Sequence, residues 1–198
     1  SFNGNKIITT GGGGMILTND EKLAERAKYL TTQAKDDPVC YIHHEVGYNF
    51  RLTNIQAALG VAQLEQLAKF IDIKRKYHEL YIKGVSDLSG IAISTIPTYA
   101  ENNYWMPVLR IKKDEVLILR EELMSYLSSK HIQVRPLWYP NHIQAKYRNC
   151  QTYRIERSIQ LWEQTLCLPS YPHMQEEQVK RVLTCIRTWH QQKISLQV

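Results

Sequence analysis

The chain has no pair of cysteines at the short spacing that zinc sites and redox motifs use. Its cysteines are separated by 110, 17 and 18 positions, at Cys40, Cys150, Cys167 and Cys185. This spacing fits neither a disulfide framework nor a zinc site. We therefore expect a protein of the reducing cytoplasm.

Metal-ligating residue types do stand side by side at His43, His44 and Glu45. Adjacent residues rarely point at one ion, and no second cluster of ligands accompanies them in the sequence. We expect no metal site.

The sequence also lacks a long apolar run. No stretch approaches the roughly 20 apolar residues of a membrane-spanning helix, and no charged-then-apolar leader stands at the start. We therefore expect no membrane partner. Because residue 1 is a serine rather than methionine, we expect a processed or trimmed polypeptide.

Neither sign of charge dominates. Lys and Arg number 25 against 19 Asp and Glu, which gives a net charge of +6. A basic balance can indicate nucleic-acid binding, but the densest cluster, residues 74–76, lies inside an amphipathic helical pattern and is better explained as a solvated helix face. We expect no nucleic-acid partner, and the modest positive field is compatible with an anionic substrate such as a sugar nucleotide.

What the sequence does contain is enough apolar material for a core. Its 198 residues are 43% hydrophobic and 22% charged, which indicates a soluble globular protein of one or two domains. No internal repeat is present, and the four glycines at residues 11–14 are the one low-complexity tract.

These glycines separate two β-prone runs, residues 7–10 and 15–18, and predict either a tight hairpin or a loop against a ligand. A capping box at Thr18 and Glu21 predicts a helix that ends near residue 33. Residues 35–48 have no periodicity and are interpreted as a mobile loop.

A second capping box, Thr53 with Gln56, opens the longest helical pattern in the chain. The pattern continues to residue 83. One small domain cannot cover a helix of this length, so we expect it to bridge two lobes.

The remaining patterns alternate between strand and helix. They predict a strand at 104–111, bent or at a sheet edge because of Pro107, a helix from Asp114 to Ser129, and a short strand at 131–134. An ordered loop at 135–150 and helices at 155–166 and around 179–186 follow. Strands separated by helices indicate an α/β or α+β layered fold.

Lys6 is the residue with the most distinctive chemical potential. A lysine whose ammonium is poorly hydrated loses its proton more easily, and the neutral amine can form a Schiff base. The alternative interpretation is a surface lysine at a strand end, and the spacing alone does not exclude it.

Three motifs taken in order resemble the pyridoxal-phosphate-dependent sugar aminotransferases of the DegT/DnrJ/StrS type. They are residues 1–6 (SFNGNK), 8–15 (ITTGGGGM) and 47–53 (GYNFRLT). The likeness runs along nearly the whole chain and implies the C-terminal half of the family's polypeptide. It implies an α/β, aspartate-aminotransferase-like fold (fold type I), with residues 1–52 ending the large cofactor-binding domain and residues 53–198 forming a connecting helix and the small domain.

The resemblance also implies roles for four residues. The lysine matching Lys6 carries pyridoxal 5'-phosphate covalently and, once freed, moves a proton at the amino donor. Ser1 contacts the cofactor phosphate. Asn49 reaches the phosphate of the neighbouring subunit, which implies a homodimer with shared active sites, and Arg51 faces the substrate.

Residues 135–142 are similar to the family's substrate loop, which often reads His-Tyr-x-Pro-x-His. The resemblance implies substrate contacts from Trp138, Tyr139 and His142, whereas Leu137 stands in place of the first histidine. An aromatic-proline loop that packs on its own domain is the alternative. Gly12 also departs from the family, where many members have glutamate.

The implied function is transfer of an amino group, with glutamate as the expected donor, to a nucleotide-linked keto-deoxysugar in surface polysaccharide precursor synthesis. Related dehydratases replace the lysine with histidine, so Lys6 disfavours that activity. The family's acidic partner for the pyridine nitrogen and its ring-stacking aromatic lie upstream of Ser1, so we expect this chain alone to be inactive. A non-catalytic regulatory or assembly fragment stays open as an alternative.

Overall fold

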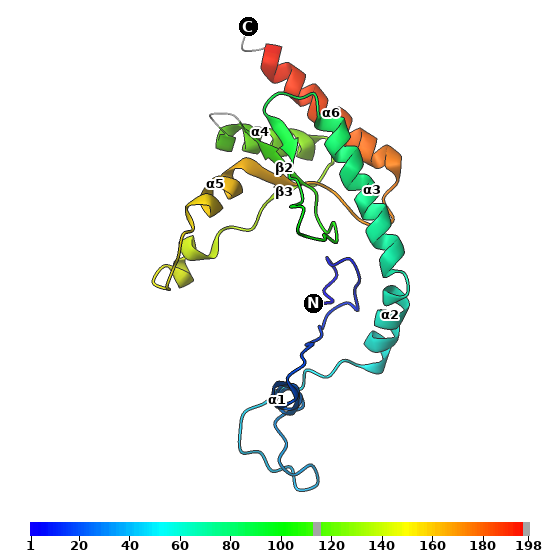
Figure 1. The fold of residues 1–198 in the computed structure, drawn as a ribbon, viewed down its shortest axis with the longest axis vertical. Coiled ribbons are helices and arrows are strands. Elements are labelled where there is room, and N and C mark those ends of the chain that lie inside the picture. Colours follow the sequence, from blue (N-terminus) through cyan, green and yellow to red (C-terminus); the bar gives the residue numbers. More distant parts are fainter. Residues whose placement is uncertain (113–115, 196–198) are drawn as a thin grey trace. The chain divides into compact units, whose positions relative to one another are not determined.

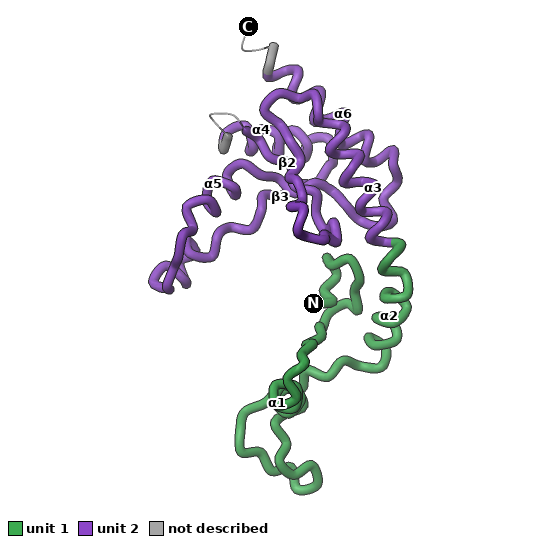
Figure 2. The backbone as a smooth tube through the Cα atoms, in the orientation of Figure 1, with its two compact units in different colours: residues 1–69 green, residues 70–198 purple. Residues whose placement is uncertain are grey.

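The computed structural model describes residues 1–112 and 116–195, and the chain divides into two compact units (Figure 2). Unit 1 is Ser1–Lys69 and unit 2 is Phe70–Val198. The division after residue 52 that the resemblance implies refers to the family's domains, and it stays a prediction.

Unit 1 contains two helices and a large share of loop (Figure 1). Helix α1 (Glu21–Thr31) begins at Asp20, whose Oδ1 accepts a hydrogen bond of 3.1 Å from the Leu23 backbone N–H. The predicted cap at Thr18 is wrong, because its hydroxyl instead accepts from the Asp20 N–H at 3.0 Å. A carboxylate at this position satisfies a free N–H group and also interacts favourably with the helix dipole.

Helix α2 (Asn54–Leu64) starts at the predicted capping box, which is confirmed. The Gln56 N–H donates to the Thr53 hydroxyl at 3.3 Å, and the Thr53 N–H donates to Gln56 Oε1 at 3.2 Å. The predicted single helix to residue 83 is wrong. At Gln66 the backbone N–H donates to the Gln63 carbonyl, three residues back instead of four, so α2 ends. A separate helix α3 (Leu67–Val85) follows.

The two β-prone runs at 7–10 and 15–18 form no strand in unit 1. Of the two structures that the glycines predicted, the chain adopts the loop and not the hairpin. An isolated two-stranded hairpin is marginal in water, so short β-prone runs need further strands that residues 1–69 do not supply.

Unit 2 is built on a four-stranded antiparallel sheet of order β1-β2-β4-β3. The strands are β1 (Ile91–Ile93), β2 (Val108–Ile111), β3 (Arg135–Pro136) and β4 (Thr165–Cys167). Leu109 lies opposite Leu166 in the register of the two central strands. Helices α4 (Val116–Ser129), α5 (Glu156–Gln164) and α6 (Glu176–Ser195) accompany the sheet (Figure 1).

The core of unit 2 lies between this sheet and its helices. Fully buried side chains come from both layers, namely Tyr81, Leu109, Leu123, Leu127, Leu166, Val179 and Ile186. Helix α3 adds three side-chain donors that meet backbone carbonyls of the 169–174 segment, at Lys74, Tyr77 and Tyr81. Within the described ranges, no helix is both long and apolar enough to cross a membrane.

Several predictions for this unit need correction. The strand at 104–111 begins only at Val108, because the preceding Pro107 has no N–H to donate. The strand predicted at 131–134 is instead β3, and the helix at 155–166 ends at Gln164 so that residues 165–167 can pair as β4. The predicted start at Asp114 lies outside the described residues.

The region 135–150 is more regular than predicted. Besides β3 it contains two 3-10 turns, η1 (Asn141–Ile143) and η2 (Ala145–Tyr147). The last predicted helix lies within α6.

Candidate active site

Residues 1–14 form a closed loop around the backbone of Phe2. The Phe2 N–H donates to the Gly13 carbonyl at 3.0 Å, and the Phe2 carbonyl accepts from the Thr10 N–H at 3.1 Å and the Thr9 hydroxyl at 2.9 Å. Gly11 and Gly13 have φ angles of +78° and +82°, which glycine adopts without a steric penalty. The glycine run thereby returns the chain to its starting point.

Lys6 lies on a turn of this loop and not at the end of a strand. Its backbone N–H donates to the Asn3 carbonyl at 3.0 Å, and the residue is half-buried. The loop therefore holds the lysine on a fixed backbone while leaving part of the residue accessible.

A cavity of about 900 Å³ lies within unit 1, and its walls include both Ser1 and Arg51. Gly13 forms another part of the wall, where an added Cβ would lie 2.9 Å from Leu52 Cδ1. A side chain at Gly13 would therefore have a strained φ angle and would require the Leu52 side chain to shift. Lys6 and Asn49 are not among the residues that line this cavity.

Asn49 lies on a segment, residues 47–51, that runs along the end of α1. The Tyr48 N–H donates to the Leu30 carbonyl and the Phe50 N–H to the Thr31 carbonyl, both at 2.9 Å. The exposed Asn49 side chain accepts from the Arg51 N–H at 3.4 Å through Oδ1. The segment is thus anchored by its backbone, and the Asn49 amide faces outward.

Gly47 is where this segment crosses the chain that leaves α1. An added Cβ would lie 2.5 Å from the Ala34 nitrogen and 2.6 Å from the Gln33 carbonyl carbon. Real Cβ atoms do not approach backbone atoms so closely, and backbone cannot move aside as a side chain can. Glycine is therefore required at the start of the predicted motif.

The predicted substrate residues of the aromatic loop belong to unit 2. The exposed Trp138 ring stacks on Trp105, with centroids 5.5 Å apart, and Tyr139 meets Trp162 edge-on at 5.1 Å. The His142 Nε2 atom is buried and has no hydrogen-bond partner among the described residues. Both alternatives for this loop keep support, since Tyr139 packs on its own unit while Trp138 is 60% exposed.

The structure thus places Ser1 and Arg51 on one cavity and Asn49 beside Arg51, while Trp138, Tyr139 and His142 lie in the other unit. Among the described residues no cluster of His, Cys, Asp and Glu has the arrangement of a metal site.

Sequence reasoning missed the roles of Thr9 and Thr10 in this site. The Thr9 hydroxyl donates to the Phe2 carbonyl and accepts from the Gly11 N–H at 2.9 Å, and the Thr10 hydroxyl donates to the Gly12 carbonyl. Two hydroxyl residues directly before a glycine run were the available signal, since such side chains hydrogen-bond to nearby backbone.

The sequence matches the DegT/DnrJ/EryC1/StrS aminotransferase family over residues 1–187. It is 37% identical over 194 residues to the GDP-perosamine synthase of Escherichia coli O157:H7, a match covering 98% of this chain and 51% of the relative. The chain therefore spans about half the length of the curated relatives that it matches.

Two solved structures have the same fold. The crystal structure of DesI in the presence of its TDP-sugar product has a TM-score of 0.86 at 23% identity, covering 99% of this chain and 50% of that one. The PLP form of Spr1654 of Streptococcus pneumoniae has a TM-score of 0.82 at 18% identity, covering 97% of this chain and 51% of that one. The aspartate-aminotransferase-like fold type I, which the motifs implied, is confirmed.

The family match covers nearly the whole chain, including the Lys6 loop, the glycine run and the Asn49 segment. The chain belongs to the DegT/DnrJ/EryC1/StrS aminotransferase family.

Proposed function

We propose that the natural polypeptide carrying this chain is a sugar aminotransferase that uses pyridoxal 5'-phosphate, the cofactor of its family. It transfers an amino group from glutamate to a keto group of a nucleotide-linked deoxysugar, for surface polysaccharide precursors, in the cytoplasm. The active protein is a homodimer with shared active sites.

The donor set of unit 1 fits this cofactor. A phosphate needs hydrogen-bond donors and positive charge, and Ser1 and Arg51, whose side chains offer a hydroxyl and a guanidinium, both line one cavity of about 900 Å³. The exposed Asn49 amide is available to a second subunit. When bound, the cofactor supplies the electron sink of transamination.

The remaining chemistry falls to this chain's own residues. Lys6 holds the cofactor through its amine and, after release, carries a proton from the Cα of the amino donor. These tasks need a primary amine on a flexible stem, which arginine cannot replace. Ser1 and Arg51 bind and orient anionic groups.

One observation carries the proposal, namely the position of Lys6 on a turn between Phe2 and Thr10. The loop that contains this turn is closed by backbone hydrogen bonds from Phe2 to Gly13 and from Thr10 to Phe2. A lysine that must meet one carbon atom repeatedly needs such a fixed backbone. An unpositioned surface lysine would not require the glycine run that closes this loop.

For the substrate, we propose a GDP-linked sugar. The support is the GDP-perosamine synthase relative, which matches almost the whole chain at the highest identity quoted above. Trp138, Tyr139 and His142 are proposed to contact the sugar nucleotide from unit 2, where the exposed Trp138 ring is suited to stacking.

The test is turnover of the natural polypeptide with Lys6→Ala and Lys6→Arg. We expect both variants to lose at least about 10³-fold in turnover, since each removes the proton-carrying amine. Lys22→Ala, which removes an exposed charge from α1, is the matched control and should transaminate normally. Near wild-type turnover by Lys6→Ala would refute the proposal.

A second candidate is a non-catalytic regulatory or assembly fragment of the same fold. It is favoured by the placement of Lys6 outside the cavity that Ser1 and Arg51 line. Absorbance titration of the isolated 198-residue chain with pyridoxal phosphate separates the two candidates. Binding by the longer polypeptide but not by the chain supports the enzyme, and binding by neither supports the fragment.

A further inference from the structure

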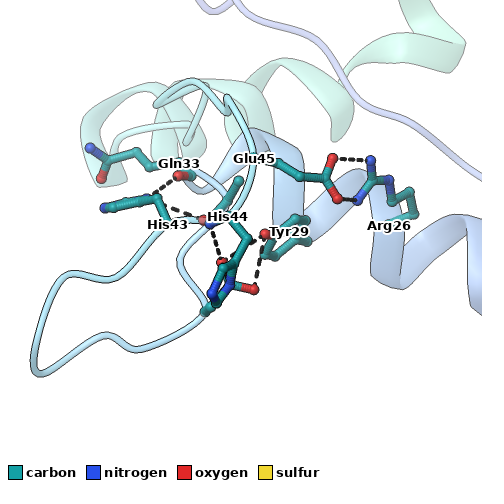
Figure 3. A network of polar contacts seen from close by, with 8 residues as sticks. Arg26, Tyr29, Gln33, His43, His44 and Glu45 are labelled. Atoms are coloured by element: carbon teal, nitrogen blue, oxygen red, sulfur yellow. Dashed lines mark hydrogen bonds and ion pairs between the residues drawn. The ribbon is translucent and has the colours of Figure 1, made fainter.

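The loop between α1 and the Asn49 segment contains the polar run His43-His44-Glu45, which has no place in the proposed chemistry. In the structure each of these side chains has a partner in unit 1 (Figure 3). The partners lie on α1, at its end, or in the same loop. This arrangement ties the loop to the helix at several points.

The first tie holds an unusual piece of backbone. Gln33 and Ala34, directly after α1, have φ angles of +76° and +48°, a left-handed conformation that costs energy for residues with a Cβ. The His43 Nδ1 atom lies 2.8 Å from the Gln33 carbonyl oxygen (Figure 3). It also lies 3.1 Å from the Ala34 carbonyl oxygen, so the ring N–H donates to both carbonyls. The Gln33 N–H donates to the Tyr48 carbonyl at 3.1 Å.

Ala34 of this pair is fully buried, whereas Gln33 is half-buried. The close approach of Gly47 occurs at the same two residues. Strain that the surrounding contacts maintain is often found where a functional group must be held. Here the strained backbone lies directly against the start of the Asn49 segment.

The second tie is made by Asp36. Its carboxylate accepts hydrogen bonds from the Tyr29 hydroxyl on α1 at 3.1 Å and from the His44 N–H at 2.7 Å. The backbone bond from His44, with smaller contributions from Tyr29 and the His44 ring, lowers the pKa of Asp36 below its ordinary value. The carboxylate therefore links α1 to the part of the loop that contains His44.

The third tie is the ion pair between Arg26 and Glu45. The guanidinium and carboxylate meet through two parallel contacts, one of 2.6 Å between Arg26 Nη1 and Glu45 Oε1 (Figure 3). Such a fork-to-fork pair fixes orientation as well as distance. Glu45 precedes Gly47 by two residues, so this pair fixes the chain just before the Asn49 segment begins.

We propose that Asp36, His43 and Glu45 are positioning residues that fix residues 47–51 on α1, so that the Asn49 amide meets the cofactor phosphate of a second subunit. We name this set, together with Arg26 and Tyr29, the loop clamp. The inference rests on the proposed function, in which Asn49 serves the neighbouring site. None of the clamp residues lines the cavity that Ser1 and Arg51 share.

The test is a charge swap in the natural polypeptide. Arg26→Glu and Glu45→Arg each break the pair, whereas the double variant restores opposite charges in reversed order. We expect each single variant to bind pyridoxal phosphate about tenfold more weakly or worse, because small misplacements of a binding group are costly. The double variant should recover most of this affinity, and saturating cofactor should restore kcat in the single variants.

Hydrogen exchange supplies a readout that does not depend on activity. The Tyr48 and Phe50 amides, which bond to the end of α1, should exchange faster in each single variant and more slowly again in the double variant. Asp37→Asn is the matched control for Asp36→Asn. Asp37 accepts from the Val39 and Cys40 N–H groups within the loop and not from α1, so its loss should leave cofactor affinity unchanged.

Wild-type cofactor affinity in both single variants would overturn the proposal, as would a double variant no better than the singles. If a charge reversal prevents folding, His43→Phe and His43→Asn take its place, since asparagine keeps a donor and phenylalanine does not. Wild-type affinity in both, or equal loss in both, overturns the proposal.

Cofactor affinity unchanged in the clamp variants, together with an inactive Lys6→Ala, would end the clamp proposal alone. An active Lys6→Ala would end the proposed function.

Discussion

The two units differ sharply in how many of their side chains are buried. Unit 2 has a continuous core that its sheet and helices share, whereas in unit 1 the buried residues are Thr10 and Ala34 alone. Yet unit 1 contains the proposed cofactor lysine and the loop that positions it. In this protein the residues proposed for chemistry and the residues that stabilise the fold are therefore concentrated in different parts of the chain.

Helix α2 illustrates the difference. It is apolar on more than one face, with Ile55 84%, Val61 59%, Leu64 59% and Leu59 45% exposed. A helix that is hydrophobic all round is normally buried. We therefore expect unit 1 to acquire its full stability only when further polypeptide covers this helix, while unit 2 relies on its own core.

The comparison is tested most strongly by removing the same side chain from one helix of each unit. Ile186→Ala in α6 removes a fully buried side chain and should lower the free energy of unfolding by about 2–5 kcal/mol. Ile55→Ala in α2 removes an exposed one and should change it by less than about 0.5 kcal/mol in the chain alone. Urea denaturation followed by circular dichroism measures both.

The same pair then sharpens the comparison in the longer natural polypeptide. If α2 is covered there, Ile55→Ala should become destabilising while the cost of Ile186→Ala stays the same. Equal, small effects of Ile55→Ala in both settings would contradict the expectation that unit 1 is covered.

A second prediction concerns Lys74, a buried cation in unit 2. Burial lowers the pKa of its amine to about 8, although it donates to the Ser170 carbonyl at 2.7 Å and the Ser170 hydroxyl at 2.9 Å. In the unfolded chain the pKa returns toward 10.5. The unfolded state therefore binds more protons, and the free energy of unfolding should rise by roughly 1–2 kcal/mol between pH 8 and 9.5.

Lys74→Met should remove this rise, and Lys69→Met, at an exposed lysine of unit 1, should retain it. Urea midpoints at four pH values between 7.5 and 9.5 provide the measurement. A rise that persists in Lys74→Met would assign the pH dependence to another group.

The smallest expected effect is at the surface of unit 2. Asp87 pairs with Arg187 through contacts of 2.7 and 2.6 Å, and the hydrogen bonds from this guanidinium lower the pKa of Asp87 to about 2. The pair should stabilise the fold above about pH 4 and lose this contribution as the pH falls toward 2. In Asp87→Asn, the free energy of unfolding should fall slightly less between about pH 4 and pH 2 than it does in the wild type. An unchanged fall would contradict the assignment of this pH dependence to Asp87.

Features that depend on residues close together in the sequence could be predicted, whereas features that depend on distant residues could not. The start of α2 was predicted correctly because Thr53 and Gln56 satisfy each other within one turn. Strands β1 and β4 were missed because each has three residues and is specified by partners far away in the sequence, as Leu166 is by Leu109. Local pattern does not contain that information.

The same reasoning applies to the site. Lys6 and the glycine run at residues 11–14 were singled out from the sequence because their motifs are local and resemble a known family. The contact of His43 with Gln33 and Ala34 could not be predicted. Nothing in the sequence indicates that these two non-glycine residues adopt a left-handed backbone conformation. Of the two structures predicted for residues 7–18, a hairpin or a loop, the loop forms. The hairpin does not form because the β-prone runs lack neighbouring strands within unit 1.

The central claim is that Lys6 is the residue to which the cofactor is attached. Borohydride reduction of the natural polypeptide with pyridoxal phosphate, followed by proteolysis and peptide mass spectrometry, tests it directly. We expect the peptide containing Lys6 to gain the mass of a reduced pyridoxyl phosphate group, and Lys6→Arg to abolish this gain. A reduced adduct on another lysine, or none anywhere in an active enzyme, would contradict it.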